Sequence, residues 1–262
     1  MTYTTIVVAD TAPVRTITLN RPERRNAMTP AMQLELIAAM EEAAADNCRV
    51  LVLAGAGEAF CSGLDLSELQ GMGVRTDPEH RAEAAQIARL LRTLYELPLP
   101  TIAAVHGAAI AGGTGLATVC DFTLAARTAK FGFTETRIGF VPAVVSAFLA
   151  LQIGDKRSRD LLMTARVFDA EEAFRLGLVN EVVDPQDLSL RVQSLSEILI
   201  TNSPQSLAAT KRLLAIQNKP WLDAAIQAAL DASAQVRLTA DFSEGIAAFL
   251  ERRRPVWKKA SS

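Results

Sequence analysis

The sequence predicts an α/β fold. Segments with the apolar content of buried strands alternate with segments of helical periodicity, and glycines stand where a strand gives way to a helix. The chain has 262 residues, 50% hydrophobic and 21% charged, which is enough apolar material for a large core and excludes intrinsic disorder. With 27 basic and 29 acidic side chains the net charge is −2, which argues against a general nucleic-acid-binding surface.

The first half of the chain supplies the alternating units. Thr29 followed by Pro30 is typical of an N-cap and the first position of a helix, here over residues 31–45. A second helix is predicted to begin at Asp77 and to stop before Pro98, and a third covers residues 114–119. The predicted strands cover residues 14–19, 49–54, 101–105 and 122–126.

A stretch from Leu97 to Cys120 contains no Asp, Glu, Lys or Arg. Its length alone would suffice to cross a bilayer. Pro98 and Pro100 interrupt its start, and four glycines punctuate the rest. A buried strand, a glycine-rich turn and a buried helix are therefore expected in place of a membrane span.

After about Asp184 the composition shifts, and the sequence pattern predicts mainly helices. The predicted helices there cover residues 188–200, 204–217, 220–236 and 241–253. We therefore expect an α/β core over residues 1–200 and a helical C-terminal region over residues 201–262 that serves assembly.

The cysteines indicate a reducing compartment. Cys48, Cys61 and Cys120 are odd in number, lie far apart and form no Cys-x-x-Cys motif, and residues 1–10 show no secretory signal. Reduced thiols in a cytoplasmic protein are expected. Because the chain has only two histidines, we expect no metal site.

Two glycine-containing loops, residues 60–66 and 106–116, are candidates for chemistry. Each can present backbone N–H groups at the start of a helix, where the helix dipole also favours negative charge. Two such groups converging on one point would form an oxyanion hole. The alternative is that the glycines only permit tight turns and close packing.

Glu135 is a third candidate for chemistry, after the two loops. Its neighbours in residues 131–142 are largely apolar. A carboxylate in such surroundings is desolvated and suited to act as a general acid or base. The alternative is an ion pair, for example with Arg137, and local sequence leaves both open.

Taken together, these motifs resemble the crotonase superfamily of enoyl-CoA hydratases and isomerases. Residues 134–146 are most similar to bacterial methylglutaconyl-CoA-type hydratases. The resemblance implies a spiral of β-β-α units with a C-terminal helical trimerisation region, assembled as a homotrimer or a dimer of trimers. The matching segments span nearly the whole chain and cover residues 19–28, 60–66, 107–121, 131–142, 175–183 and 249–253.

The resemblance also implies roles for individual residues. The backbone N–H groups of Leu64 and Gly112 match the two oxyanion-hole donors, which would hold the thioester oxygen as it becomes an enolate. Glu135 matches the glutamate that exchanges a proton with a substrate carbon. Phe249 would come from a neighbouring subunit. The residues expected to contact the acyl-CoA are Arg25, Ser62, Leu64, Asp65, Leu66, Gly113, Phe249 and Arg252.

One departure from the family pattern leaves the reaction open. Gly115 stands where the hydratases carry their other glutamate. We expect a hydratase in which one glutamate both activates water and protonates carbon. The alternatives are a double-bond isomerase with a single glutamate and a non-catalytic acyl-CoA-binding subunit. Coenzyme A is part of the substrate, so no separate cofactor is expected, and neither is a membrane or nucleic-acid partner.

Overall fold

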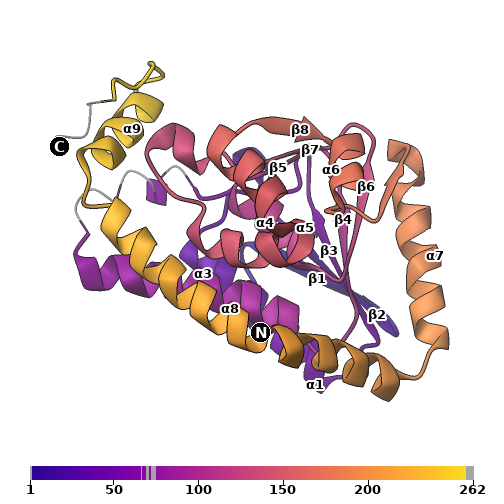
Figure 1. The fold of residues 1–262 in the computed structure, drawn as a ribbon. Helices are drawn as coiled ribbons and strands as arrows, with labels where there is room; N and C mark the ends of the chain where they lie inside the picture. The colour runs from indigo at the N-terminus through magenta and orange to yellow at the C-terminus, as the bar shows by residue number, and fades with distance from the viewer. Residues whose placement is uncertain (1, 66, 69–70, 72–74, 258–262) are drawn as a thin grey trace.

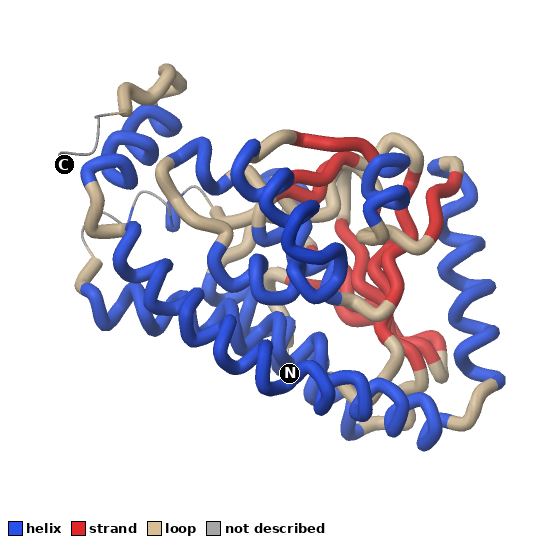
Figure 2. Tube along the Cα trace, viewed as in Figure 1, coloured by secondary structure: helices blue, strands red, loops and turns tan. Residues whose placement is uncertain are grey.

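The computed structural model describes residues 2–65, 67–68, 71 and 75–257, and in these it is built from two sheets enclosed by helices (Figures 1 and 2). The larger sheet has six strands in the order β1-β2-β3-β4-β6-β9. β1 pairs antiparallel with β2, and the remaining pairs are parallel. Its strands are β1 (Ile6–Thr11), β2 (Val14–Leu19), β3 (Val50–Gly55), β4 (Thr101–Val105), β6 (Phe122–Ala126) and β9 (Glu181–Val183).

A smaller, three-stranded sheet lies beside the first. In it β5 pairs parallel with β7, and β7 pairs antiparallel with β8. Its strands are β5 (Ala108–Ile110), β7 (Lys130–Gly132) and β8 (Val167–Asp169). The helices are α1 (Pro30–Ala45), α3 (Asp77–Glu96), α4 (Gly112–Val119), α5 (Ala143–Thr164), α6 (Ala170–Leu176), α7 (Leu188–Thr201), α8 (Pro204–Val236) and α9 (Ala240–Leu250), with 3₁₀ turns η1 (Pro22–Arg24), η2 (Glu135–Ile138) and η3 (Pro185–Asp187).

The central strands are apolar on both sides because both faces of the large sheet are covered. Along β3, Leu51 and Leu53 belong to the main core, whereas Val50 and Val52 face a smaller cluster completed by α7. Successive side chains of a strand point to opposite faces, so an unbroken apolar run is what a doubly covered strand requires. Figure 1 shows α7 along one side of the sheet.

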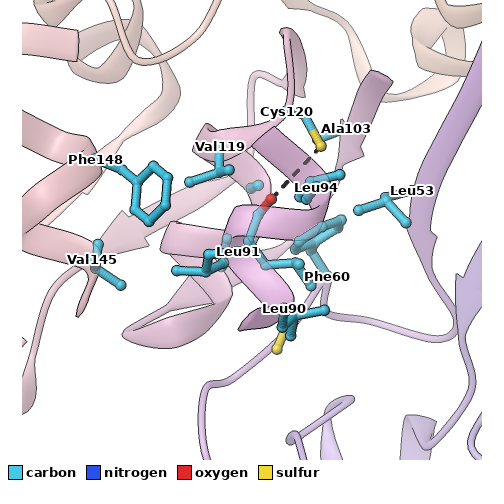
Figure 3. Packing of buried hydrophobic residues seen from close by; sticks show 14 of the residues in the cluster. Leu53, Phe60, Leu90, Leu91, Leu94, Ala103, Val119, Cys120, Val145 and Phe148 are labelled. Carbon is cyan, nitrogen blue, oxygen red and sulfur yellow. Dashed lines mark hydrogen bonds between the residues drawn. The ribbon is translucent and has the colours of Figure 1, made fainter. Parts of the chain in front are cut away.

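The main core lies between the large sheet and helices α1, α3, α4 and α5. Figure 3 shows Leu90, Leu91 and Leu94 of α3 packed towards Phe60 and the strands. Each of these apolar side chains removed from water stabilises the fold by roughly 1.5–3 kcal/mol. α8 runs along α3 and α5 and joins this core through Leu222 and Ile226. The predicted division at residue 200 stays a prediction.

The predicted strands and most predicted helices are confirmed. The uncharged stretch from Leu97 to Cys120 folds as β4, β5 and α4, and no helix in the described part of the chain is long and apolar enough to span a membrane. The predicted cap is also present, since Thr29 Oγ1 accepts a hydrogen bond from Met32 N at 3.2 Å. α4 begins at Gly112, two residues earlier than expected, which places that glycine at the helix start.

The predicted break near Pro220 is wrong. α8 runs from Pro204 to Val236 as one helix with Pro220 inside it. A proline removes one backbone hydrogen bond and crowds the preceding turn. Contacts before and after this point hold the helix together despite that loss. Asn218 Nδ2 donates to Tyr95 Oη of α3 at 2.9 Å, and Leu222 and Ile226 pack in the main core.

Candidate active site

A cavity of about 470 Å³ lies between the glycine loops and helices α3, α5, α8 and α9. Its lining combines residues of the glycine loops with apolar side chains of α3. The lining residues are Glu23, Arg24, Arg25, Ala27, Met28, Gln33, Ser62, Leu64, Asp65, Ala84, Ile87, Leu90, Leu91, Ala111, Gly112, Thr134, Glu135, Ile138, Phe140, Val141, Pro142, Ala143, Val144, Val145, Ser233, Arg237 and Phe249.

The two predicted loops lie side by side at this cavity. Cys61 N donates to Ala108 O at 3.0 Å, and Ile110 N donates to Cys61 O at 2.9 Å. A Cβ added to Gly63 would lie 3.0 Å from Ala111 Cβ. The backbone of Gly63 also has a φ of +91°, a conformation that residues with a side chain rarely adopt. Both the close approach and this φ therefore require glycine at position 63. The backbone of one loop is thereby fixed against that of the other.

Leu64 and Gly112 both line the cavity. Leu64 pairs with Met28 in a parallel bridge in which Met28 N donates to Gly63 O at 2.7 Å and Asp65 N donates to Met28 O at 3.0 Å. In this pattern the N–H of Leu64 itself points away from Met28. Gly112 is the first residue of α4, where the backbone N–H groups lack partners within the helix. The residues of both predicted oxyanion donors therefore line the same cavity, and the convergence of their N–H groups stays a prediction.

The buried side chain of Asp65 holds the first loop in place. Asp65 accepts hydrogen bonds from Arg21 Nη1 at 2.7 Å and from Ser67 N at 2.9 Å. These donors keep the pKa of Asp65 below its usual value, although burial acts in the opposite direction. Asp65 is therefore ionised and anchors the loop that carries Leu64.

The sequence analysis did not predict a role for Asn26 at the site. Its Nδ2 donates to Ala56 O at 2.8 Å and to Ala59 O at 2.7 Å, and its Oδ1 accepts from Arg21 N at 2.9 Å. Its backbone has a φ of +55°, a left-handed conformation that asparagine tolerates better than most residues. That preference is the signal that sequence reasoning could have used.

Glu135 lies in η2 with only 8% of its surface exposed. Its Oε2 is buried without a hydrogen-bond partner among the described residues. Burial raises the pKa of Glu135 to about 7, because the charged form loses its hydration. Arg137 is exposed and does not line the cavity, so the alternative of an ion pair with it is not found. The carboxyl group is available for proton transfer near neutral pH.

Val145 occupies the space that a side chain at position 115 would need, where the hydratases were expected to carry their other glutamate. A Cβ added to Gly115 would lie 2.6 Å from Val145 Cγ2, closer than real Cβ atoms come to other atoms. Val145 belongs to the core and also lines the cavity. The absence of a carboxylate at residue 115 is therefore matched by a valine that occupies the space a side chain would need.

The other predicted contacts divide into three groups. Arg25, Ser62, Asp65 and this chain's own Phe249 line the cavity with Leu64, and a contribution of Phe249 from a neighbouring subunit stays a prediction. Gly113 and Arg252 do not line it. Gly113 is packed against a backbone carbonyl, since an added Cβ would lie 2.2 Å from Cys61 O, and Arg252 is exposed. Leu66 lies outside the described residues. Contact of any of these residues with a substrate stays a prediction.

The structure supports neither a cysteine nucleophile nor, among the described residues, a metal site. Burial raises the pKa of Cys61 to about 12, which suits a packed thiol and not a nucleophile. Among the residues that the structure describes, no three His, Cys, Asp or Glu side chains form a group able to hold a metal ion.

Comparison with known proteins gives consistent matches over nearly the whole chain. The enoyl-CoA hydratase/isomerase family model matches residues 10–260. Crotonyl-CoA hydratase of Syntrophomonas wolfei is 32% identical over 257 residues, 97% of this chain and 98% of the relative. The 1,2-epoxyphenylacetyl-CoA isomerase of Escherichia coli is 32% identical over 92% of this chain and 94% of the relative. The crystal structure of an enoyl-CoA hydratase/isomerase from Xanthobacter autotrophicus Py2 matches with a TM-score of 0.89 at 30% identity, covering 95% of this chain and 94% of that one.

Proposed function

Because the chain belongs to the enoyl-CoA hydratase/isomerase family, we propose that it adds water across the α,β double bond of an acyl-CoA thioester with Glu135 as its single acid–base group. The crotonase-type α/β fold and the assignment as an enzyme of this family, both predicted from sequence, are confirmed. The closer similarity to methylglutaconyl-CoA-type hydratases stays a prediction.

The observation that carries this proposal is the environment of Glu135. With a pKa of about 7 its carboxyl group exists in both protonation states near neutral pH. As a base it takes a proton from water while the water oxygen bonds to the β-carbon. As an acid it then returns that proton to the α-carbon, so atoms and charges balance. A single residue can serve both steps because its pKa lies near the working pH.

The electrons of the broken double bond must be held between these two steps. They move onto the thioester oxygen, which becomes an enolate oxygen. Leu64 N–H and Gly112 N–H are the proposed donors to that oxygen, in a cavity wall where the dipole of α4 also favours negative charge. Loss of one such donor typically lowers kcat by 10²–10³.

A second candidate is a double-bond isomerase. The packing of Gly115 against Val145 favours it, because an isomerase needs one carboxyl group and this cavity has no second one at that position. Glu135 would then remove the α-proton of a 3-enoyl thioester and deliver it to the γ-carbon. One relative of comparable similarity is named as an isomerase.

The deciding experiment offers crotonyl-CoA and a 3-enoyl-CoA to the enzyme in deuterated water. A hydratase gives 3-hydroxybutyryl-CoA labelled at the α-carbon, whereas an isomerase converts only the 3-enoyl substrate. Glu135→Gln should abolish turnover. Glu197→Gln, the same change at an exposed position of α7, should leave it intact. Equal activity of wild type and Glu135→Gln would refute the assigned role.

We propose in addition that the chain forms a homotrimer or a dimer of trimers. Apolar side chains of α8 support this, because Leu213, Leu214, Ile216 and Trp221 are each more than half exposed. Light scattering should then give three or six times the chain mass of 28.2 kDa. A monomer mass would contradict the proposal.

A cytoplasmic location is proposed from the cysteines, all three of which are free thiols in the structure. No separate cofactor is proposed, because the substrate carries coenzyme A.

A further inference from the structure

Helix α9 packs on the turn that carries Glu135 and not on the main core. Figure 1 shows α9 beyond the end of α8, apart from the sheets. Its buried side chains Phe242 and Ile246 form a small cluster of their own, and the main core includes no α9 residue among those described. The element that α9 contacts most extensively is η2. This helix is therefore placed to influence the position of the proton-transfer group.

Two glycines let α9 lie directly on the backbone of this turn. A Cβ added to Gly245 of α9 would lie 2.3 Å from the carbonyl carbon and oxygen of Ile138. A Cβ added to Gly139, which follows η2, would lie 2.3 Å from Asp241 O. Glycine weakens a helix interior relative to alanine, so the close approach accounts for its presence at position 245. The two backbones are in contact with no side chain between them to take up a shift.

The residues that α9 contacts also close the turn around Glu135. Gly139 N donates to Thr136 O at 3.3 Å, and Phe140 N donates to Glu135 O at 3.1 Å. The ring of Phe140 lies 5.8 Å from the ring of Phe242 on α9, measured between their centres. A displacement of α9 would therefore pass through Gly139 and Phe140 to the backbone of Glu135.

The same cluster reaches the other half of the site. Ile138 and Phe140 pack against Phe242 and Ile246, and so does Leu64, whose N–H is a proposed oxyanion donor. In the proposed reaction one group moves a proton at a carbon of the acyl chain while the other holds the thioester oxygen. Such groups act together only when their positions are held to within about 0.5 Å. A single helix contacts both halves and is suited to fix their separation.

We propose that Gly245 and Phe242 are positioning residues through which α9 sets the distance between the Glu135 carboxyl group and the Leu64 N–H. This role rests on the proposed function, because it presupposes that both groups act on one thioester. Neither Gly245 nor Phe242 lines the cavity, so both act through η2 and Leu64 and not on the substrate. The role belongs to each single chain and adds to the part in assembly expected of the C-terminal region.

Two variants test this role with the substrate that wild type turns over, crotonyl-CoA or a 3-enoyl-CoA. Gly245→Ala forces α9 away from Ile138, and Phe242→Leu removes the ring beside Phe140 while leaving the helix backbone unchanged. Each should lower kcat about 10- to 100-fold and change KM much less, because the reacting groups are misplaced.

The pH profile separates this role from a general loss of stability. Burial raises the pKa of Glu135 to about 7, against 4.5 for an ordinary glutamate. A loosened η2 admits water to the carboxyl group and lowers this pKa. The acidic limb of the kcat/KM profile should therefore lie near pH 7 in wild type and at lower pH in Gly245→Ala and Phe242→Leu.

Two controls match these changes elsewhere. Phe168→Leu alters a ring in the small sheet that is 3% exposed, as Phe242 is, and that also stacks on one aromatic ring, that of Phe131 at 6.0 Å. Ser243→Ala changes an exposed position of α9 itself. Both should keep the wild-type kcat and acidic limb, and Tm measured for every variant shows that Phe242→Leu and Phe168→Leu lose comparable stability.

The possible failures are distinguishable. A lowered Tm with unchanged kcat and an unmoved acidic limb, in both Gly245→Ala and Phe242→Leu, would overturn the role and leave α9 as a purely stabilising element. An equal loss of kcat in Phe242→Leu and Phe168→Leu, with neither limb moved, would overturn it as well. Absence of turnover by wild type with crotonyl-CoA and with a 3-enoyl-CoA would instead refute the proposed function itself.

Discussion

Glu135→Gln should make the protein more stable at high pH while abolishing its activity. The wild-type carboxyl group has a pKa of about 7 in the folded protein against 4.5 for an ordinary glutamate. A difference of about 2.5 units corresponds to roughly 3 kcal/mol. This is the free energy that the folded state loses when the buried carboxyl group ionises.

The sign follows from proton binding. Between pH 4.5 and 7 the folded state holds a proton that the unfolded state has released, so the free energy of unfolding falls as pH rises. The neutral carboxyl group contributes its full stability below pH 4.5, and that contribution is lost once the pH passes about 7. Glutamine does not ionise and escapes this loss, although its buried amide also needs partners. A net gain of about 1–3 kcal/mol is expected at pH 8 and almost none at pH 5.

The assay is thermal unfolding followed by circular dichroism at pH 5 and pH 8. For a chain of this size 1 kcal/mol shifts Tm by about 2–4 °C, so Glu135→Gln should raise Tm at pH 8 by about 2–12 °C. The exposed Glu197→Gln serves as the control and should show no such difference between the two pH values. A Tm gain of the same size at both pH values, or a loss at pH 8, would refute the reasoning that burial destabilises the charged form.

Three further changes test the packing around the site. Gly115→Ala should lower stability by about 1–2 kcal/mol, because overpacking against Val145 outweighs the better helix propensity of alanine, and Val145→Ala in the same chain should restore much of that loss. Simple additivity of the two changes in denaturant unfolding would contradict the contact. Asp65→Ala should cost about 2–4 kcal/mol and reduce kcat, since it leaves Arg21 unpaired beside the loop that carries an oxyanion donor; unchanged kcat in a steady-state assay would contradict its positioning role. Pro220→Ala should raise Tm, because it restores a backbone hydrogen bond to Ile216 inside α8, and an unchanged or lowered Tm would show that the helix is adapted to the proline.

The elements predicted correctly are those whose local pattern coincides with their environment. β3 and β4 are continuous apolar runs because both of their faces are covered, and α1 carries its cap in the sequence as Thr29 and Pro30. The strands of the small sheet escaped prediction because three residues are too few to establish a period.

The site could be predicted only in part, for the same reason. Glu135 was identified because its apolar neighbours in sequence predict a desolvated carboxyl group, and the structure buries it. Gln33 and Arg237, which also line the cavity, were not identified from the sequence, because no local sequence pattern distinguishes them. Their positions depend on partners 53 and 157 residues away, which only the packing of α1 and α8 against α3 brings within reach.

The adjacent glycine loops have a consequence for how this enzyme can be mapped by mutation. The donors proposed for Leu64 and Gly112 are main-chain groups, and the bonds that position their loops at Cys61 and Met28 also run through the main chain. Replacing Leu64 by alanine would keep its N–H in place, so an alanine scan would find Glu135 and overlook this half of the site. Replacement of the Leu64 amide by an ester, which deletes the N–H and keeps the side chain, is the change that would expose it.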